Sequence, residues 1–162
     1  MKTAIAYYSM SGNTEETAQK IAKKLGAALI RIDPEKEYPN KGLRKFIWGG
    51  KSAVMGETPA LQSYSFSGDF ENVIIGTPVW ASNIAPPIRT FIKENRDKLN
   101  GKSISAFVCC SGGGAEKALG KLKEALGVNR LDAEMVLIDP KDKPSAENDT
   151  KISMFCGNLI EL

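Results

Sequence analysis

The chain has 162 residues, of which 42% are hydrophobic and 25% charged, and its formal net charge is +3 at pH 7. This length and composition predict a single globular domain, 1–162, and the scattered lysines and arginines argue against nucleic-acid binding. The absence of histidine excludes histidine-based triads and most zinc sites, so we expect no metal. No apolar run approaches the about 20 residues that span a bilayer, and no signal peptide is recognisable. We therefore expect a cytoplasmic protein without membrane insertion.

Apolar runs alternate with amphipathic segments along the chain. The apolar runs predict strands at 2–8, 27–32, 70–77, 103–110 and 131–138. Helical spacing predicts five helices. The first begins near Glu15 and ends before Gly26, and the others lie near 41–54 and at 86–99, 115–126 and 152–160. Strands that alternate with helices indicate an α/β fold with a doubly wound parallel sheet.

The segment 34–68 interrupts this alternation and reads as an insertion. We expect a loop, a helix and a second loop lying over one edge of the sheet. The helix places Leu43, Phe46, Ile47 and Val54 on one side. The sequence leaves open whether this segment covers a ligand, binds a partner or forms a dimer.

Three cysteines, Cys109, Cys110 and Cys156, argue against a disulfide framework because their number is odd. Inert buried thiols are the favoured interpretation over a redox pair. Cys109 and Cys110 are adjacent, so on a strand their side chains point to opposite faces.

Ligands of doubly wound sheets bind beyond the carboxyl ends of the strands. Three strand-to-helix loops leave those ends, at 9–14, 78–85 and 110–114. All three are rich in serine, threonine, glycine or asparagine, and none contains a charged residue. We therefore expect them to form one ligand site.

The first loop, 9–14, offers hydroxyl and amide groups at the start of a helix, where free N–H groups and the helix dipole attract anions. A simple helix cap is the alternative, but a cap needs one such residue and the loop has four. The loop lacks the lysine of a nucleotide-triphosphatase loop and the G-x-G-x-x-G pattern of dinucleotide sites. Gly101-Lys102-Ser103 precedes a strand, so it does not form a triphosphate loop either.

The other two loops offer different chemistry. Trp80 in the second loop is either a stacking platform for a flat ring or a plug of the core, and we favour the platform. The glycines of the third loop allow backbone N–H groups to approach a ring edge, although a flexible turn is the alternative.

The strand followed by Ser9-Met10-Ser11-Gly12-Asn13-Thr14, the Thr77-Pro78-Val79-Trp80 loop and the Ser111-Gly112-Gly113-Gly114 loop together resemble the flavodoxin family. The resemblance implies a three-layer fold with five parallel strands in the order 2-1-3-4-5 and a noncovalently bound flavin mononucleotide (FMN). By the family pattern, the first loop holds the phosphate and the other two lie beside the ring. The candidate cofactor-binding residues are Ser9, Met10, Ser11, Gly12, Asn13, Thr14, Thr77, Pro78, Val79, Trp80, Ala81, Asn83, Cys110, Ser111, Gly112, Gly113 and Gly114.

The resemblance leaves three functions open. The favoured one is an electron carrier, a monomer or homodimer that shuttles electrons between redox partner proteins and has no catalytic residue of its own. The alternative is an FMN-dependent oxidoreductase that takes electrons from NAD(P)H and reduces a quinone or a similar acceptor. A binding module that has lost the flavin is the third, and the hydroxyl-rich first loop argues against it.

Overall fold

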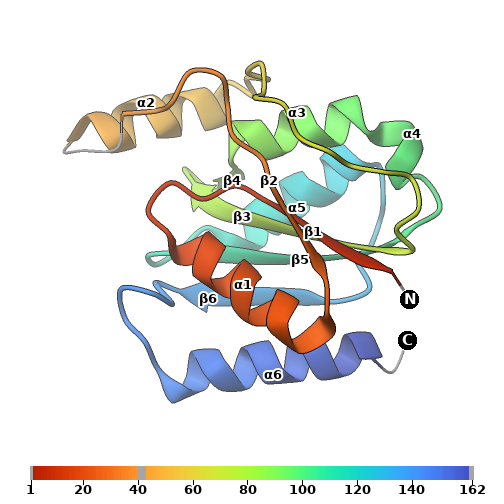
Figure 1. Ribbon diagram of the computed structural model, residues 1–162. Coiled ribbons are helices and arrows are strands. Elements are labelled where there is room, and N and C mark those ends of the chain that lie inside the picture. The colour runs from red at the N-terminus through yellow and green to blue at the C-terminus, as the bar shows by residue number, and fades with distance from the viewer. Residues whose placement is uncertain (1, 40–42, 161–162) are drawn as a thin grey trace.

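The computed structural model describes residues 2–39 and 43–160, and for residues 43–46 only the backbone (Figure 1). Its strands are β1 (Thr3–Tyr7), β2 (Ala28–Arg31), β3 (Asn72–Trp80), β4 (Asn83–Ile84), β5 (Ser103–Cys110) and β6 (Glu134–Ile138). Its helices are α1 (Asn13–Leu25), α2 (Leu43–Val54), α3 (Pro86–Glu94), α4 (Arg96–Leu99), α5 (Ala115–Leu126) and α6 (Ala146–Ile160). No helix in these ranges is long and apolar enough to cross a membrane.

The sheet has the order β2-β1-β3-β5-β6, and all of these neighbours pair in parallel. Counted along the chain without β4, this is the predicted order. The short β4 was not predicted, and it pairs antiparallel with the end of β3. The predicted α/β fold with a doubly wound parallel sheet is therefore confirmed.

The central strands β1, β3 and β5 bury both faces against helices, and Figure 1 shows α1 and α6 on one side of the sheet and α3 and α5 on the other. Along β1, Ala4 and Ala6 join the core beneath α3 and α5, whereas Ile5 and Tyr7 join the core beneath α1 and α6. This alternation follows from the two-residue period of a strand. It explains why the sequence shows continuous apolar runs.

The predicted element boundaries were wrong in four places, one of which is the last helix: α6 begins at Ala146 rather than at 152. β3 continues through Pro78 to Trp80, so the expected loop 78–85 is largely a strand pair joined by a turn. The expected helix 86–99 breaks at Asn95, whose side-chain amide donates to the carbonyl of Phe91 and to the hydroxyl of Tyr64. The last strand begins at Glu134 rather than at 131.

The segment 34–68 contains the predicted helix as α2, while residues 40–42 lie outside the described residues. Two residues of its predicted apolar side, Ile47 and Val54, are 57% and 66% exposed. The side chains of Leu43 and Phe46 lie outside the described part. After α2 the chain runs along α3, where the Pro59 carbonyl accepts a hydrogen bond from Thr90.

Candidate functional site

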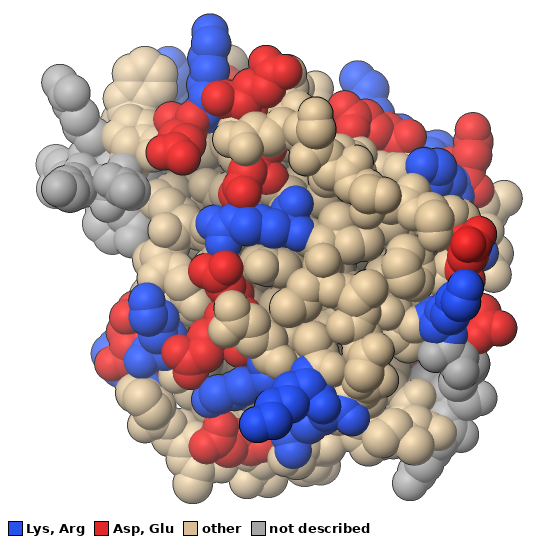
Figure 2. All heavy atoms as spheres, in the orientation of Figure 1, with Lys and Arg blue, Asp and Glu red and all other residues tan. Residues whose placement is uncertain are grey.

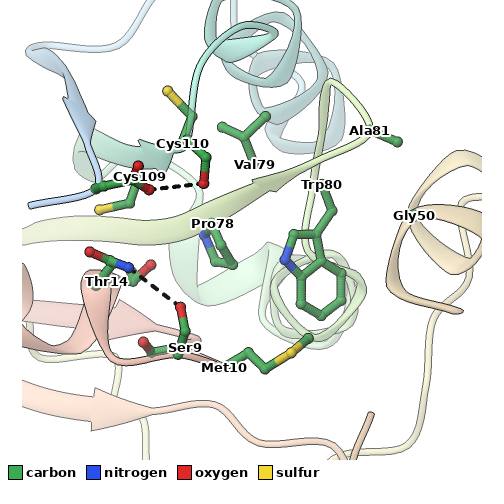
Figure 3. Close-up of a pocket in the computed structure, with 14 residues that line it drawn as sticks. Ser9, Met10, Thr14, Gly50, Pro78, Val79, Trp80, Ala81, Cys109 and Cys110 are labelled. Atoms are coloured by element: carbon green, nitrogen blue, oxygen red, sulfur yellow. Dashed lines mark hydrogen bonds between the residues drawn. The ribbon is translucent and has the colours of Figure 1, made fainter. Parts of the chain in front are cut away.

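A cavity of about 350 Å³ lies at the carboxyl ends of β1, β3 and β5. Figure 3 shows Ser9, Thr14, Trp80 and Cys110 around it. The cavity is lined by Ser9, Met10, Ser11, Asn13, Thr14, Gly50, Pro78, Val79, Trp80, Ala81, Cys109, Cys110, Ser111 and Asp139. Residues from all three predicted loops therefore meet at one edge of the sheet.

The 9–14 loop is held in a fixed turn by its own polar groups. The Gly12 N–H donates to Ser9 Oγ at 3.1 Å, and Gly12 has φ +96°, a left-handed conformation that favours glycine. From β2, Arg31 Nη2 donates to the Ser9 carbonyl at 3.0 Å. Arg31 is itself fixed by Glu15 and Asp33, each at 2.8 Å. The turn is thus shaped before any ligand arrives.

Thr14 stands at the start of α1 with an unsatisfied hydroxyl. Its side chain is 1% exposed, and its Oγ1 has no oxygen or nitrogen partner; the neighbouring Cys109 thiol, a weak hydrogen-bonding group, is the contact it makes. A buried hydroxyl without such a partner is destabilising by about 1–3 kcal/mol. An anion in the turn would supply the missing acceptor, in the position where α1 directs its dipole and its free N–H groups.

A fourth loop, between β6 and α6, also reaches this turn. The backbone N–H of Lys141 donates to Asn13 Oδ1 at 2.8 Å, and Asn13 Nδ2 donates to Asp142 Oδ2 at 2.8 Å. Lys141 Nζ donates to the Ser11 carbonyl at 3.3 Å, which brings a cation to the anion site. The sequence analysis predicts a site built from three loops and misses this fourth one. Since ligands bind beyond the carboxyl ends of the parallel strands, the loop after β6, with Lys141, also belongs to the candidate site.

Asp139 and Gly50 also line the cavity without having been predicted. Asp139 accepts a hydrogen bond from the Ser111 hydroxyl at 2.8 Å and forms an ion pair with Lys143 at 3.0 Å. It thereby joins the third loop to the fourth. Gly50 belongs to α2, and no local signal in the sequence placed that helix at the cavity.

Trp80 forms one wall of the cavity. Its indole contacts Tyr8 and Tyr38 edge to face, with ring centroids 5.6 and 5.2 Å apart. A side chain on Gly49 would come within 3.2 Å of the indole, so α2 approaches it closely. The indole is partly buried and lines the cavity at the same time. Trp80 therefore packs on aromatic neighbours while one side remains available to a ligand.

A tight turn places the second and third loops in contact. Ala81 and Ser82 both have positive φ, 48° and 60°, as a two-residue turn between antiparallel strands requires. At Gly114 (φ +89°) a Cβ would lie 3.0 Å from the Ser82 Cα, so this position excludes larger residues. The turn carries Ala81 to the rim of the cavity.

Six of the predicted residues do not line the cavity. Thr77 is fully buried, and its hydroxyl accepts from the Ala85 N–H at 3.0 Å. Asn83 donates to the Ala53 carbonyl at the end of α2 and accepts from Arg89. Of the other four, Gly12 and Gly114 cap the starts of α1 and α5, and Gly112 and Gly113 lie exposed in the loop before α5.

The cysteines are free and buried. Burial raises the pKa of the Cys109 thiol to about 12, although the Thr17 hydroxyl, 3.8 Å away, opposes the shift. Cys109 and Cys110 lie in opposite cores, as the strand geometry predicts. Within residues 2–39 and 43–160, no cluster of cysteine and carboxylate side chains suits a metal ion.

The fold is shared with solved flavoproteins. A flavoprotein from Lactobacillus acidophilus in complex with FMN is similar at 22% identity, with a TM-score of 0.70, over 93% of this chain and 97% of that chain. Flavodoxin 2 from Bacillus cereus matches at 19% identity with a TM-score of 0.59, over 99% of each chain. The family model described as flavodoxin matches residues 2–137. The chain therefore belongs to the flavodoxin family.

Proposed function

We propose that the cavity binds FMN noncovalently and that the protein transfers electrons between redox partners through it. The observation that carries the proposal is the buried, unpartnered hydroxyl of Thr14 at the start of α1. Hydroxyls and N–H groups at a helix start suit a phosphate. The solved relative from Lactobacillus acidophilus is described as a complex with FMN.

The chain's own residues divide into two groups around this ligand. Ser11, Asn13 and Thr14 would hold the phosphate. The positive charge of the Lys141 ammonium would attract the phosphate anion more strongly than a neutral donor would. Trp80 would stack on the ring, which contributes about 0.5–1.5 kcal/mol beyond the burial of area.

When bound, FMN supplies the redox chemistry, and the protein sets how strongly it is held and how far it is shielded from water. Pro78, Val79 and Met10 give the cavity apolar walls that would exclude water from the ring. Ser111 would offer its backbone to a ring edge. The cavity therefore has a polar end, which would hold the phosphate, and an apolar end, which would hold the ring.

Titration of the flavin-free protein tests the proposal. Quenching of flavin fluorescence gives the dissociation constants of FMN and of riboflavin, which lacks the phosphate. We expect FMN to bind at least about hundredfold more tightly, since two charge-assisted hydrogen bonds are worth about 3 kcal/mol or more. Equal affinities would remove the phosphate assignment, and no binding of either flavin would remove the proposal.

Anaerobic addition of NADPH to the FMN-loaded protein tests the electron-carrier role. An electron carrier keeps its yellow colour under NADPH and loses it with dithionite. Rapid bleaching by NADPH alone would overturn the carrier role in favour of an NADPH-dependent oxidoreductase.

A further inference from the structure

A second concave surface lies between the end of α2, helices α3 and α4, and α5, on the side of the sheet away from α1 and α6 (Figure 1). This groove holds about 470 Å³. Its charged lining residues are Arg89, Lys93, Arg96, Lys121 and Glu124. Glu124 is the only carboxylate among the described residues of the groove, and it already pairs with Lys121 at 2.9 Å.

Arg89 is the least exposed of these cations. Its Nη2 donates to Asn83 Oδ1 at 2.9 Å, while its Nε is buried without a hydrogen-bond partner. No carboxylate in the described part of the chain forms an ion pair with it, and burial lowers the pKa of its guanidinium. A partly buried positive charge without a counter-charge is unfavourable, so an anion in the groove would stabilise it.

On the opposite side of the molecule, lysines form ion pairs with carboxylates. Acidic and basic side chains are interspersed over the α1–α6 face (Figure 2). There Lys20 lies 3.2 Å from both Glu16 and Asp149, and Lys151 lies 2.8 Å from Glu147. These two lysines therefore have carboxylate partners, whereas Arg89 has none among the described residues.

A further hollow lies between the groove and the candidate flavin cavity and shares lining residues with both. It is lined by Asn83 and Lys121, which it shares with the groove, and by Ala81, which it shares with the cavity. Val54, 66% exposed, lines both the hollow and the groove and offers an apolar surface beside the cations. A ligand with a phosphate-bearing middle and flat ends matches this sequence of surfaces.

We propose that the groove is a binding site for the diphosphate of a nucleotide, whose phosphates pair with Arg89, Lys93 and Arg96. Diphosphate oxygens match guanidinium groups in geometry and charge. Val54 and Ala125 give a base an apolar surface to lie on. A nucleoside diphosphate occupies the groove alone. A dinucleotide would also extend past Ala81 to the cavity; this extension rests on the proposed binding of FMN there and not on the electron-carrier role.

Calorimetric titration of the FMN-saturated protein with ADP, NAD⁺ and NADP⁺ at low salt tests the site. The oxidised dinucleotides are used because they leave FMN oxidised. We expect saturable ADP binding that weakens with added salt. Arg89→Gln and the fully surface-located Lys93→Gln should each weaken it about tenfold, the loss of one charge-assisted contact. Lys23→Gln on α1 is the matched control and should change nothing.

The outcomes separate the groove from the cavity. Absence of saturable ADP binding, or equal losses in Lys23→Gln and Lys93→Gln, would overturn the groove. Tighter binding of a dinucleotide than of ADP shows that the ligand extends beyond the cation cluster, while equal affinities assign the groove to mononucleotides. FMN affinity, measured separately by fluorescence, should be unchanged in Lys93→Gln. If FMN does not bind, ADP binding that depends on Arg89 still supports the groove.

Discussion

Thr14→Val should change the stability of the flavin-free protein and its affinity for FMN in opposite directions. Valine has the shape of threonine without the hydroxyl that is buried and unpartnered here. Removing such a hydroxyl should raise the free energy of unfolding by about 1 kcal/mol, the lower end of the range for an unsatisfied buried polar group. Urea unfolding of the flavin-free protein measures this gain.

The same substitution should weaken FMN binding by about tenfold, or about 1.4 kcal/mol, because the phosphate loses one donor. Flavin fluorescence titration measures this loss. Thr17→Val is the matched control on the same helix, since the Thr17 hydroxyl is satisfied and donates to the Asn13 carbonyl at 3.1 Å. It should lower the unfolding free energy by about 1 kcal/mol. If Thr14→Val also lowers the stability, or leaves FMN affinity intact, the reasoning is refuted.

Three further predictions concern other parts of the molecule. Lys141→Gln should weaken FMN binding severalfold and leave riboflavin binding unchanged, and a parallel loss for both ligands in fluorescence titrations would contradict a phosphate contact. Gly76→Ala should lower the unfolding free energy by about 1–3 kcal/mol, because the new Cβ overlaps the Phe107 ring; adding Phe107→Leu should restore part of the loss in urea unfolding. The pKa of Cys109 rises from 9.0 to about 12 on folding, so the folded state binds more protons than the unfolded one between these values. Stability should therefore fall as the pH rises through this window, and Cys109→Ala should show a shallower decline in melting temperature between pH 8 and 10.

The parallel sheet could be predicted because its central strands are buried on both faces. β5 lies at 103–110 as predicted, and its apolar run needs no partner to be recognised. The continuation of β3 through Pro78 could not be predicted in this way. Pro78 lies opposite Cys109 in β5, and β4 pairs beyond it, so tertiary pairing decides where this strand ends.

The candidate site was predictable to the extent that local chemistry defines it. The 9–14 loop combines a strand end, hydroxyl groups and a helix start within a few residues, and these residues meet at the cavity. Lys141 reaches the same loop from a distant part of the chain, so no local pattern includes both. Helical periodicity at α2 shows which side chains share a face, but it does not show whether another element covers them. The exposure of Ile47 and Val54 could therefore not be predicted from the pattern.

The hydrogen bonds that join Asn13 to Lys141 and Asp142 link segments separated by 128 and 129 positions in the sequence. A chain truncated after β6 keeps every strand of the sheet and lacks both of these bonds. Such a truncated chain should bind a flavin phosphate weakly. Tight binding of the cofactor therefore depends on the segment after β6 as much as on the first loop.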